Sequence, residues 1–150
     1  MEDEDLIVAF LDMVENHKMI VENSGLLTVA ALKHLNVKNK KIVSILSGGN
    51  MDVITMSSVV QQGLVLRDRI FTVSVLLPDK PGELTRVSGV IAGQSGNVIK
   101  LEHNQFVSIN RNAAVELRIT LEAYGTEHKN QIIEALNKNG YQPKVVRASI

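Results

Sequence analysis

The sequence predicts an α+β protein in two parts: a mostly helical segment with one strand over 1–66, and a segment of alternating strands and helices over 67–150. Three observations support this. Apolar residues recur at helical spacing near the N-terminus. A short apolar run at 42–46 ends in a glycine pair. From Phe71 onward, stretches that alternate apolar and polar residues are separated by stretches of helical period.

The first segment begins with an expected amphipathic helix behind an acidic first turn, which suits the helix dipole. Its apolar stripe is Leu6, Ile7, Phe10, Met13 and Val14. Ser24-Gly25 interrupts this pattern, and a short helix over 26–32 follows. Because that helix is apolar nearly all round, we expect it to be buried.

Residues 42–46 are predicted to form a buried strand, followed by the loop Ser47-Gly48-Gly49-Asn50 and a third helix over 52–64. Asp52 is a suitable N-cap for that helix, and Gly63 marks its end. The loop would present backbone N–H groups and one hydroxyl at the carboxyl end of a strand, where open α/β sheets bind ligands. A plain turn that needs positive φ is the alternative.

One strand with three apolar helices cannot form a sheet of its own, and about 66 residues make a marginal core. We therefore expect 1–66 to pack as a small bundle or against a partner chain, or to be part of a larger α/β domain.

The second segment begins at the polar link Arg67-Asp68-Arg69. Its predicted elements are a strand over 71–77, a helix with the stripe Leu84, Val87 and Ile91, a strand from Val98 to Phe106, a strand with Val115, Leu117, Ile119 and Leu121 inward, a helix from Thr126 as N-cap to Asn139, and a strand from Tyr141 to Arg147. The order βαββαβ predicts a ferredoxin-like sandwich, an antiparallel four-stranded sheet with two helices on one face.

Composition excludes several classes of function. Lys plus Arg equal Asp plus Glu at 16 each, so no net charge attracts nucleic acid or an anionic membrane. Cysteine is absent, which excludes thiol chemistry, and tryptophan is absent as well. No apolar run approaches the ~18 residues of a membrane span. The acidic N-terminus lacks the basic region of a signal peptide. We expect a cytoplasmic globular protein without a metal site.

Two stretches carry a resemblance to a known family. The first, Ile20-Val21-Glu22-Asn23-Ser24-Gly25 with Val43 to Asp52, resembles the carboxyl end of the catalytic domain of threonine dehydratases, which are fold-type II pyridoxal-phosphate enzymes. The second, Leu77-Pro78-Asp79-Lys80-Pro81-Gly82-Glu83-Leu84 with Asn97 to His103, resembles an ACT regulatory domain. Together they match the layout of single-ACT threonine dehydratases over almost the whole chain.

The first resemblance implies that Ser47 faces the pyridine nitrogen of the cofactor, while Gly48 and Gly49 let the backbone approach the ring. The family's Schiff-base lysine motif and its glycine-rich phosphate loop do not occur here. We therefore expect a carboxyl-terminal fragment or truncated product that binds no pyridoxal phosphate alone and lacks threonine deaminase activity. Whether the chain is an enzyme in its own right stays open on the sequence.

The second resemblance implies an amino-acid effector site at a dimer interface. The expected effector residues are Asp79, Lys80, Pro81 and Gly82, with Asn97, Val98 and Ile99 at a facing strand start. Pro81 would lie at or near the first position of the helix, where its missing N–H costs nothing. The alternative for Pro81-Gly82 is a simple strand terminator. His103 is interpreted as a sheet or interface residue, since no second metal ligand stands at useful spacing.

Three functions follow as hypotheses. The first is the regulatory portion of a threonine dehydratase, with isoleucine or a similar amino acid as effector and a homodimer as the minimum unit. The second is a free-standing amino-acid-binding module that regulates a partner in trans. The third, an RNA-binding domain of similar topology, is disfavoured because only Phe71 and Phe106 could stack on bases.

Overall fold

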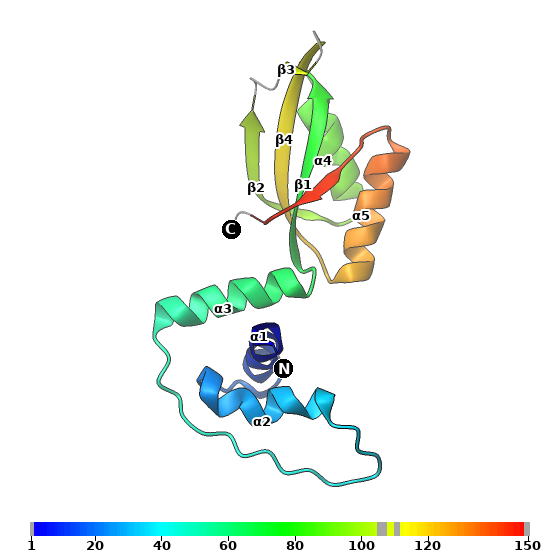
Figure 1. Cartoon of the computed structure of the whole chain (residues 1–150). Helices are drawn as coiled ribbons and strands as arrows, with labels where there is room; N and C mark the ends of the chain where they lie inside the picture. Colours follow the sequence, from blue (N-terminus) through cyan, green and yellow to red (C-terminus); the bar gives the residue numbers. More distant parts are fainter. Residues whose placement is uncertain (1, 105–107, 110–111, 149–150) are drawn as a thin grey trace. The chain divides into compact units, whose positions relative to one another are not determined.

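The computed structural model describes residues 2–104, 108–109 and 112–148. The chain divides into two compact units, 1–66 and 67–150, at the position of the polar link (Figure 1). Each unit has its own cluster of buried apolar side chains.

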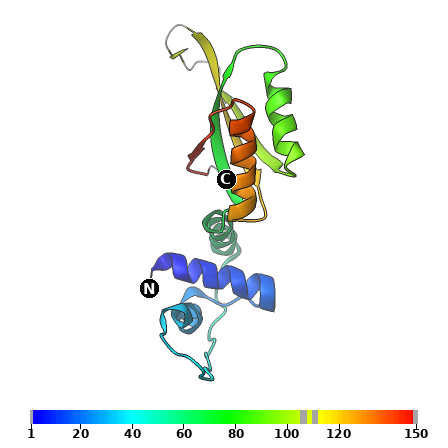
Figure 2. The same ribbon diagram turned by 90° about the vertical axis from the view of Figure 1, so that its right-hand side faces the viewer.

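The first unit is built from helices. α1 (Asp3–Asp12) continues into a π-helical turn, η1 (Met13–His17), that ends at Lys18 in left-handed geometry. A broken helix follows, made of η2 (Asn23–Leu26), α2 (Leu27–Ala30) and η3 (Ala31–His34). After a long connection comes α3 (Val53–Leu66). α1 contacts both α2 and α3, so it is the central helix of the unit (Figure 2).

The predicted stripe of the first helix is confirmed, because Phe10 and Met13 are buried and Leu6, Ile7 and Val14 pack beside them. Asp52 caps α3 as predicted: its carboxylate accepts hydrogen bonds from the backbone N–H groups of Ile54 at 3.0 Å and Thr55 at 2.9 Å.

Two predictions about these helices are wrong. The helix over 26–32 is only half buried, since Leu26 and Ala30 face the core while Leu27 and Leu32 are exposed. Gly63 does not end α3, which continues to Leu66. A Cβ at Gly63 would lie 3.2 Å from Leu11 Cδ2, so this glycine allows α1 and α3 to approach closely.

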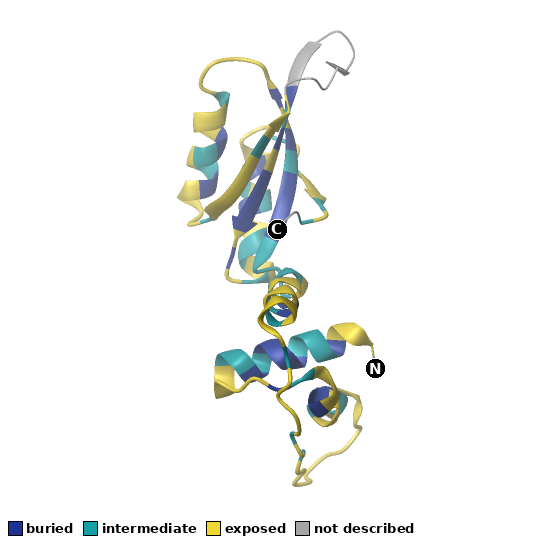
Figure 3. Ribbon diagram, turned by 90° about the vertical axis from the view of Figure 1, so that its left-hand side faces the viewer, coloured by how far each residue is buried: buried dark blue, intermediate teal, exposed yellow. Residues whose placement is uncertain are grey.

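The predicted buried strand at 42–46 is also wrong. Residues 35–52 contain no helix or strand, and Val43 and Ile45 are 89% and 74% exposed (Figure 3). A strand requires a hydrogen-bonded neighbour. Within the described part of 1–66 no other strand exists, so the apolar run has nothing to pair with.

The second unit is an antiparallel sheet with two helices, and the predicted α+β class is confirmed here. The strands are β1 (Ile70–Pro78), β2 (Asn97–Asn104), β4 (Asn112–Glu122) and β5 (Lys144–Val146), in the order β2-β4-β1-β5. A short β3 (Ser108–Ile109) pairs with β4. The prediction for Phe106 lies outside the described residues.

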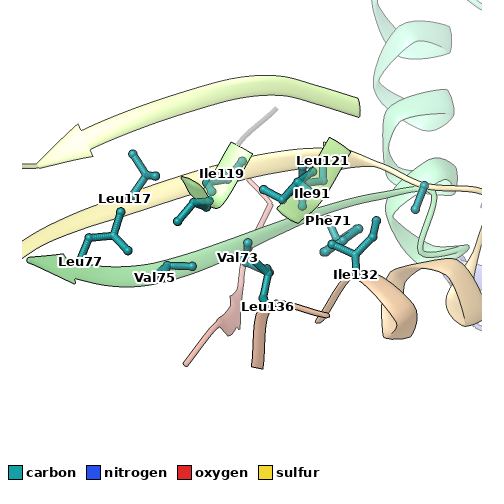
Figure 4. Packing of buried hydrophobic residues seen from close by; sticks show 12 residues of the cluster. Phe71, Val73, Val75, Leu77, Ile91, Leu117, Ile119, Leu121, Ile132 and Leu136 are labelled. Carbon is teal, nitrogen blue, oxygen red and sulfur yellow. The ribbon is translucent and has the colours of Figure 1, made fainter. Parts of the chain in front are cut away.

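The helices α4 (Glu83–Gly93) and α5 (Thr126–Lys138) contact each other and cover one face of the sheet. Alternate residues of β1 and β4 project toward them, as the period-2 pattern predicts. Figure 4 shows these side chains interleaved with apolar residues of the two helices. The buried cluster comprises Phe71, Val73, Val75, Leu77, Val87, Ile91, Leu117, Ile119, Leu121, Ala123, Ile132 and Leu136.

Two details of the helices differ from expectation. Leu84 is 44% exposed, so the buried stripe of α4 is Val87 and Ile91 with Val90 beside them. Thr126 is the first helical residue of α5 and Gly125 is its N-cap. The Thr126 hydroxyl instead donates a hydrogen bond to the carboxylate of Asp68 at 2.8 Å, because Asp68 lies at the start of the unit beside the first turn of α5.

The face of the sheet opposite the helices carries polar pairs. The hydroxyls of Thr72 on β1 and Thr120 on β4 are 2.9 Å apart and both residues are buried. Ser74 on β1 donates a hydrogen bond to Glu116 Oε1 on β4 at 2.7 Å.

Candidate functional site

The Ser47-Gly48-Gly49 loop lies against the segment that precedes α2. Gly48 has φ 78°, and its carbonyl accepts a hydrogen bond from the Glu22 backbone N–H at 3.4 Å. The Ser47 backbone is so close to Gly25 that a side chain at Gly25 would collide with it. The three loop residues are exposed. Gly48 therefore uses the conformational freedom of glycine, as the plain-turn interpretation requires.

The groups around this loop do not by themselves fit pyridoxal phosphate. Ser47 supplies one neutral hydroxyl for a ring nitrogen. The side chain nearest Gly48 is the Glu22 carboxylate, which accepts a hydrogen bond from the Ser24 hydroxyl at 2.7 Å and would repel a phosphate. Among the described residues, no lysine lies among the nearest neighbours of Gly48 and Gly49 or among the backbone hydrogen-bond partners of the loop. We derive no catalytic step from it.

The loop between β1 and α4 encloses a small pocket of 230 Å³. Asp79, Lys80, Pro81 and Gly82 form its rim, and His103 of β2 faces them. The apolar part of its lining is Leu77, Leu84, Val115 and Leu117. The structure thus brings together the four loop residues that the sequence singled out.

The backbone at this loop is set for the start of a helix. Gly82 adopts left-handed geometry with φ 90° and is the N-cap of α4, so Pro81 lies immediately before the N-cap, near the first helical position as predicted. Glycine has no side chain with which to cap the helix, and within the described residues no side-chain cap is present at α4. The first N–H groups of a helix need partners and carry its positive dipole end. An anion is therefore favoured here.

The other three predicted residues lie elsewhere. Asn97, Val98 and Ile99 begin β2, and Asn97 pairs with Glu122, whereas the loop follows Pro78, which pairs with Ala114. These pairs mark opposite ends of β4. The Asn97 amide donates a hydrogen bond to Glu122 Oε2 at 3.1 Å. Within one chain, residues 97–99 therefore do not lie next to residues 79–82.

Besides Leu77, Pro78, Glu83 and Leu84 next to the loop, sequence reasoning missed three lining residues on β2 and β4, namely His103, Val115 and Leu117. All three could have been found from the pattern of alternation. The register pairs His103 with Leu117, so both lie on the helix-facing side of neighbouring strands, near the end of β1. Residues on that side near the 79–82 loop are the ones able to line a pocket beneath it.

Other classes of site find no support in the described residues. No group of three or more histidine, aspartate or glutamate side chains could hold a metal ion there. None of the described helices has the length and apolar character needed to cross a membrane. Phe71 is buried beneath the helices and cannot stack on a base.

Comparison with known proteins links the whole chain to one group of enzymes. An L-threonine ammonia-lyase from Geobacter sulfurreducens is 35% identical over 148 residues, which is 97% of this chain and 37% of that protein. An L-threonine ammonia-lyase from Thermotoga maritima is 30% identical over 145 residues, 96% of this chain and 36% of that protein. The chain spans little more than a third of the length of these curated relatives.

No family model matches the sequence. Among solved structures, the ACT domain of prephenate dehydrogenase from Bacillus anthracis is similar over 49% of this chain and 99% of that domain, with 22% identity and a TM-score of 0.38. A TM-score of 0.38 is too low to establish a shared fold.

Proposed function

We propose that this chain is the C-terminal regulatory portion of a threonine dehydratase, the enzyme class that converts L-threonine to 2-oxobutanoate and ammonia. In this proposal 1–66 is the end of the pyridoxal-phosphate-dependent domain and 67–150 is an ACT domain that binds an amino-acid effector such as isoleucine. Support comes from relatives that align with 97% of the chain while the chain spans 37% of their length. The observation that carries the effector site is the pocket at the start of α4.

Each part of an aliphatic amino acid has a counterpart at this pocket. The ligand carboxylate accepts hydrogen bonds from the first N–H groups of α4, where the helix dipole favours an anion. The Asp79 carboxylate on the rim attracts the ligand ammonium group. The apolar side chain of the ligand contacts Leu84, Val115 and Leu117.

A second copy of the chain completes the site. At 230 Å³ the pocket is smaller than the about 300–1,000 Å³ of typical ligand sites. β2 is an edge strand whose backbone is open to pairing, and Val98, Ile99 and Leu101 on it are exposed. Antiparallel pairing of two β2 strands around a two-fold axis at Lys100 would place 97–99 of one copy opposite 101–103 of the other, with Asn97 opposite His103. Because His103 lines the pocket, residues 97–99 of the partner then reach it.

Calorimetry of the full chain with L-isoleucine, L-valine, L-threonine and L-serine tests this proposal. We expect saturable binding of at least one of the branched amino acids. Gly82→Val places a β-branched residue at φ 90°, which distorts the N-terminus of α4, and should weaken that binding at least tenfold. Gly89→Ala, within α4, serves as the control because a Cβ there meets no atom within 4 Å. Absence of heat and of thermal stabilisation with all four amino acids would refute the effector site.

A further inference from the structure

The sheet face opposite the helices contains a second hollow, separate from the 79–82 loop. Its volume is 460 Å³, within the range of about 300–1,000 Å³ typical of small-molecule sites. The floor is formed by Ser74 and Leu76 of β1. The walls are Glu116 of β4 on one side and the segment leading into β5, with Gln142, Lys144 and Val146, on the other. The loop pocket shares none of these residues.

Glu116 supplies a fixed negative charge. Its Oε1 accepts hydrogen bonds from the Ser74 hydroxyl at 2.7 Å and from Arg118 Nε at 3.2 Å. These donors, Ser74 first, lower the pKa of Glu116, so the carboxylate is ionised at neutral pH. The Asn104 side chain also donates a hydrogen bond to this carboxylate. An ionised carboxylate has about four lone-pair sites, so it can still accept a bond from a ligand in the hollow.

Lys144 supplies a positive charge across β1 from Glu116. It is the register partner of Ser74 on β5, whereas Glu116 is the register partner of Leu76 on β4. Both side chains therefore project from the same face of the sheet, on either side of one strand. In the part of the chain that the structure describes, Lys144 makes no ion pair, so its ammonium group can bind a ligand anion.

The strip between the two charges is partly apolar. Leu76 is 46% exposed on this face, although its neighbours Val75 and Leu77 are buried among the helices. Val146, opposite Thr72 on β5, lines the far end of the hollow, beyond Lys144. An apolar group seated here would cover exposed surface of Leu76, and such burial is favourable.

The combination excludes several kinds of ligand. The Glu116 carboxylate would repel a phosphate. A divalent cation would find only one carboxylate ligand among the lining residues and would be repelled by the nearby ammonium group of Lys144. A nucleobase would find no aromatic side chain to stack on among the lining residues. A zwitterion with a small aliphatic group matches all three features.

We propose that this open-face hollow is a second amino-acid site, with Lys144 binding the ligand α-carboxylate, Glu116 the α-ammonium group, and Leu76 the aliphatic side chain. The Gln142 amide provides a further polar contact in the lining. The site lies within one chain, so it does not depend on the dimer proposed above.

Amide chemical-shift mapping of the full, ¹⁵N-labelled chain during titration with L-isoleucine tests this proposal. We expect saturable shifts at Ser74, Leu76 and Lys144, with an affinity distinct from that of the 79–84 region. Two analogues separate the charges: 2-methylbutylamine lacks the carboxylate and 3-methylpentanoate lacks the ammonium group. Each should bind the hollow at least tenfold more weakly than isoleucine, because each leaves one charged side chain without its partner.

Variants distinguish the two sites. Lys144→Met and Glu116→Gln should each weaken the shifts on the open face at least tenfold and leave those at 79–84 unchanged, while Gly82→Val should do the reverse. Lys138→Met removes an exposed lysine of α5 and is the matched control. Because Lys144 is exposed, its substitution tests binding even if the Glu116 variant folds poorly. Shifts confined to 79–84, equal binding of the analogues, or unchanged binding by Lys144→Met would overturn the second site.

Discussion

At the scale of single residues, Gly96 shows how closely the core of the second unit is packed. It lies between the end of α4 and the start of β2. A Cβ at this position would lie 2.8 Å from Ile91 Cγ2 and 3.0 Å from Ile132 Cδ1. Both isoleucines are buried, so neither can move away freely. Gly96→Ala should therefore lower the free energy of unfolding by about 1–3 kcal/mol.

Gly89→Ala provides the matched comparison for Gly96→Ala. Gly89 lies inside α4 and a Cβ there meets no atom within 4 Å. Alanine is the better helix former, so this change should stabilise the unit by about 0.5–1 kcal/mol. Urea unfolding of both variants measures the difference. Equal stabilities would show that the end of α4 is more loosely packed than the structure indicates.

Asp68 is the second residue whose role can be measured. Its carboxylate contacts Lys129 Nζ at 2.6 Å and the Thr126 hydroxyl at 2.8 Å, and these contacts, Lys129 first, lower the pKa of Asp68. A carboxyl whose folded-state pKa is lowered stabilises the fold above its unfolded-state pKa, and that stabilisation is lost as the pH falls through the folded-state value.

Asp68→Asn isolates this contribution. Asp68 has φ 54°, a conformation that asparagine also tolerates, so the backbone is preserved. We expect the variant to be less stable by about 1–2 kcal/mol at pH 7. The difference from the parent chain should shrink as the pH is lowered below about 4, the ordinary pKa of aspartate, because the unfolded chain then binds the proton more readily than the folded one. A difference that is constant from pH 7 to pH 2 would contradict the charged contact.

At the scale of elements, the two central strands are joined by the Thr72–Thr120 hydroxyl pair. Both residues are buried and their hydroxyls are 2.9 Å apart. Thr72→Val or Thr120→Val alone leaves one hydroxyl without its partner and should cost about 1–2 kcal/mol. The double variant removes both hydroxyls and should lie within about 0.5 kcal/mol of the parent. Additive losses in this double-mutant cycle would show that the two hydroxyls do not interact.

The same central strands show which elements the sequence could predict. β1 and β4 were predicted correctly because one side of each faces the helices, and that burial leaves a period-2 pattern in the residues. The run at 42–46 has comparable apolar content but forms no strand, because strand formation depends on a neighbour and its own unit has none among the described residues. Local pattern is sufficient only where the pairing partner belongs to the same chain.

The sequence also predicted only part of the candidate site. The Pro-Gly pair marked the loop before α4 correctly, since proline restricts φ and glycine permits the positive φ that Gly82 adopts. The position of 97–99 relative to that loop was not recognised, although it follows from the order of strands and helices along the chain. A strand that follows a single crossover helix runs parallel to the strand before it. Its start therefore lies at the opposite end of the sheet from the end of β1.

At the scale of the whole molecule, the chain should not act as a lyase by itself. The Ser47 loop offers a hydroxyl and lies beside the Glu22 carboxylate, with no lysine among the nearest neighbours of Gly48 and Gly49 in the described residues. After addition of pyridoxal phosphate we expect no absorbance band of an internal aldimine. The appearance of such a band, and its removal by borohydride, would contradict this expectation.

The central claim for the molecule is an effector site shared between two copies of the chain. Two variants test it together, both made in a Lys144→Met parent so that the open-face hollow contributes no isoleucine binding. Gly82→Val disables the loop, and Ile99→Ser removes an exposed apolar group from the start of β2. Sedimentation should first establish that each variant still forms dimers. Each variant dimer should then bind isoleucine at least tenfold more weakly than the parent.

The most direct measurement is calorimetry on an equimolar mixture of these two variants after exchange of subunits. A mixed dimer combines an intact loop from one chain with an intact strand from the other at one of its two positions. We predict that the mixture regains binding of parental affinity, with about one quarter of the parental number of sites, since half of the dimers are mixed and each has one intact site. A mixture that binds no better than either variant alone would contradict a site built from two chains.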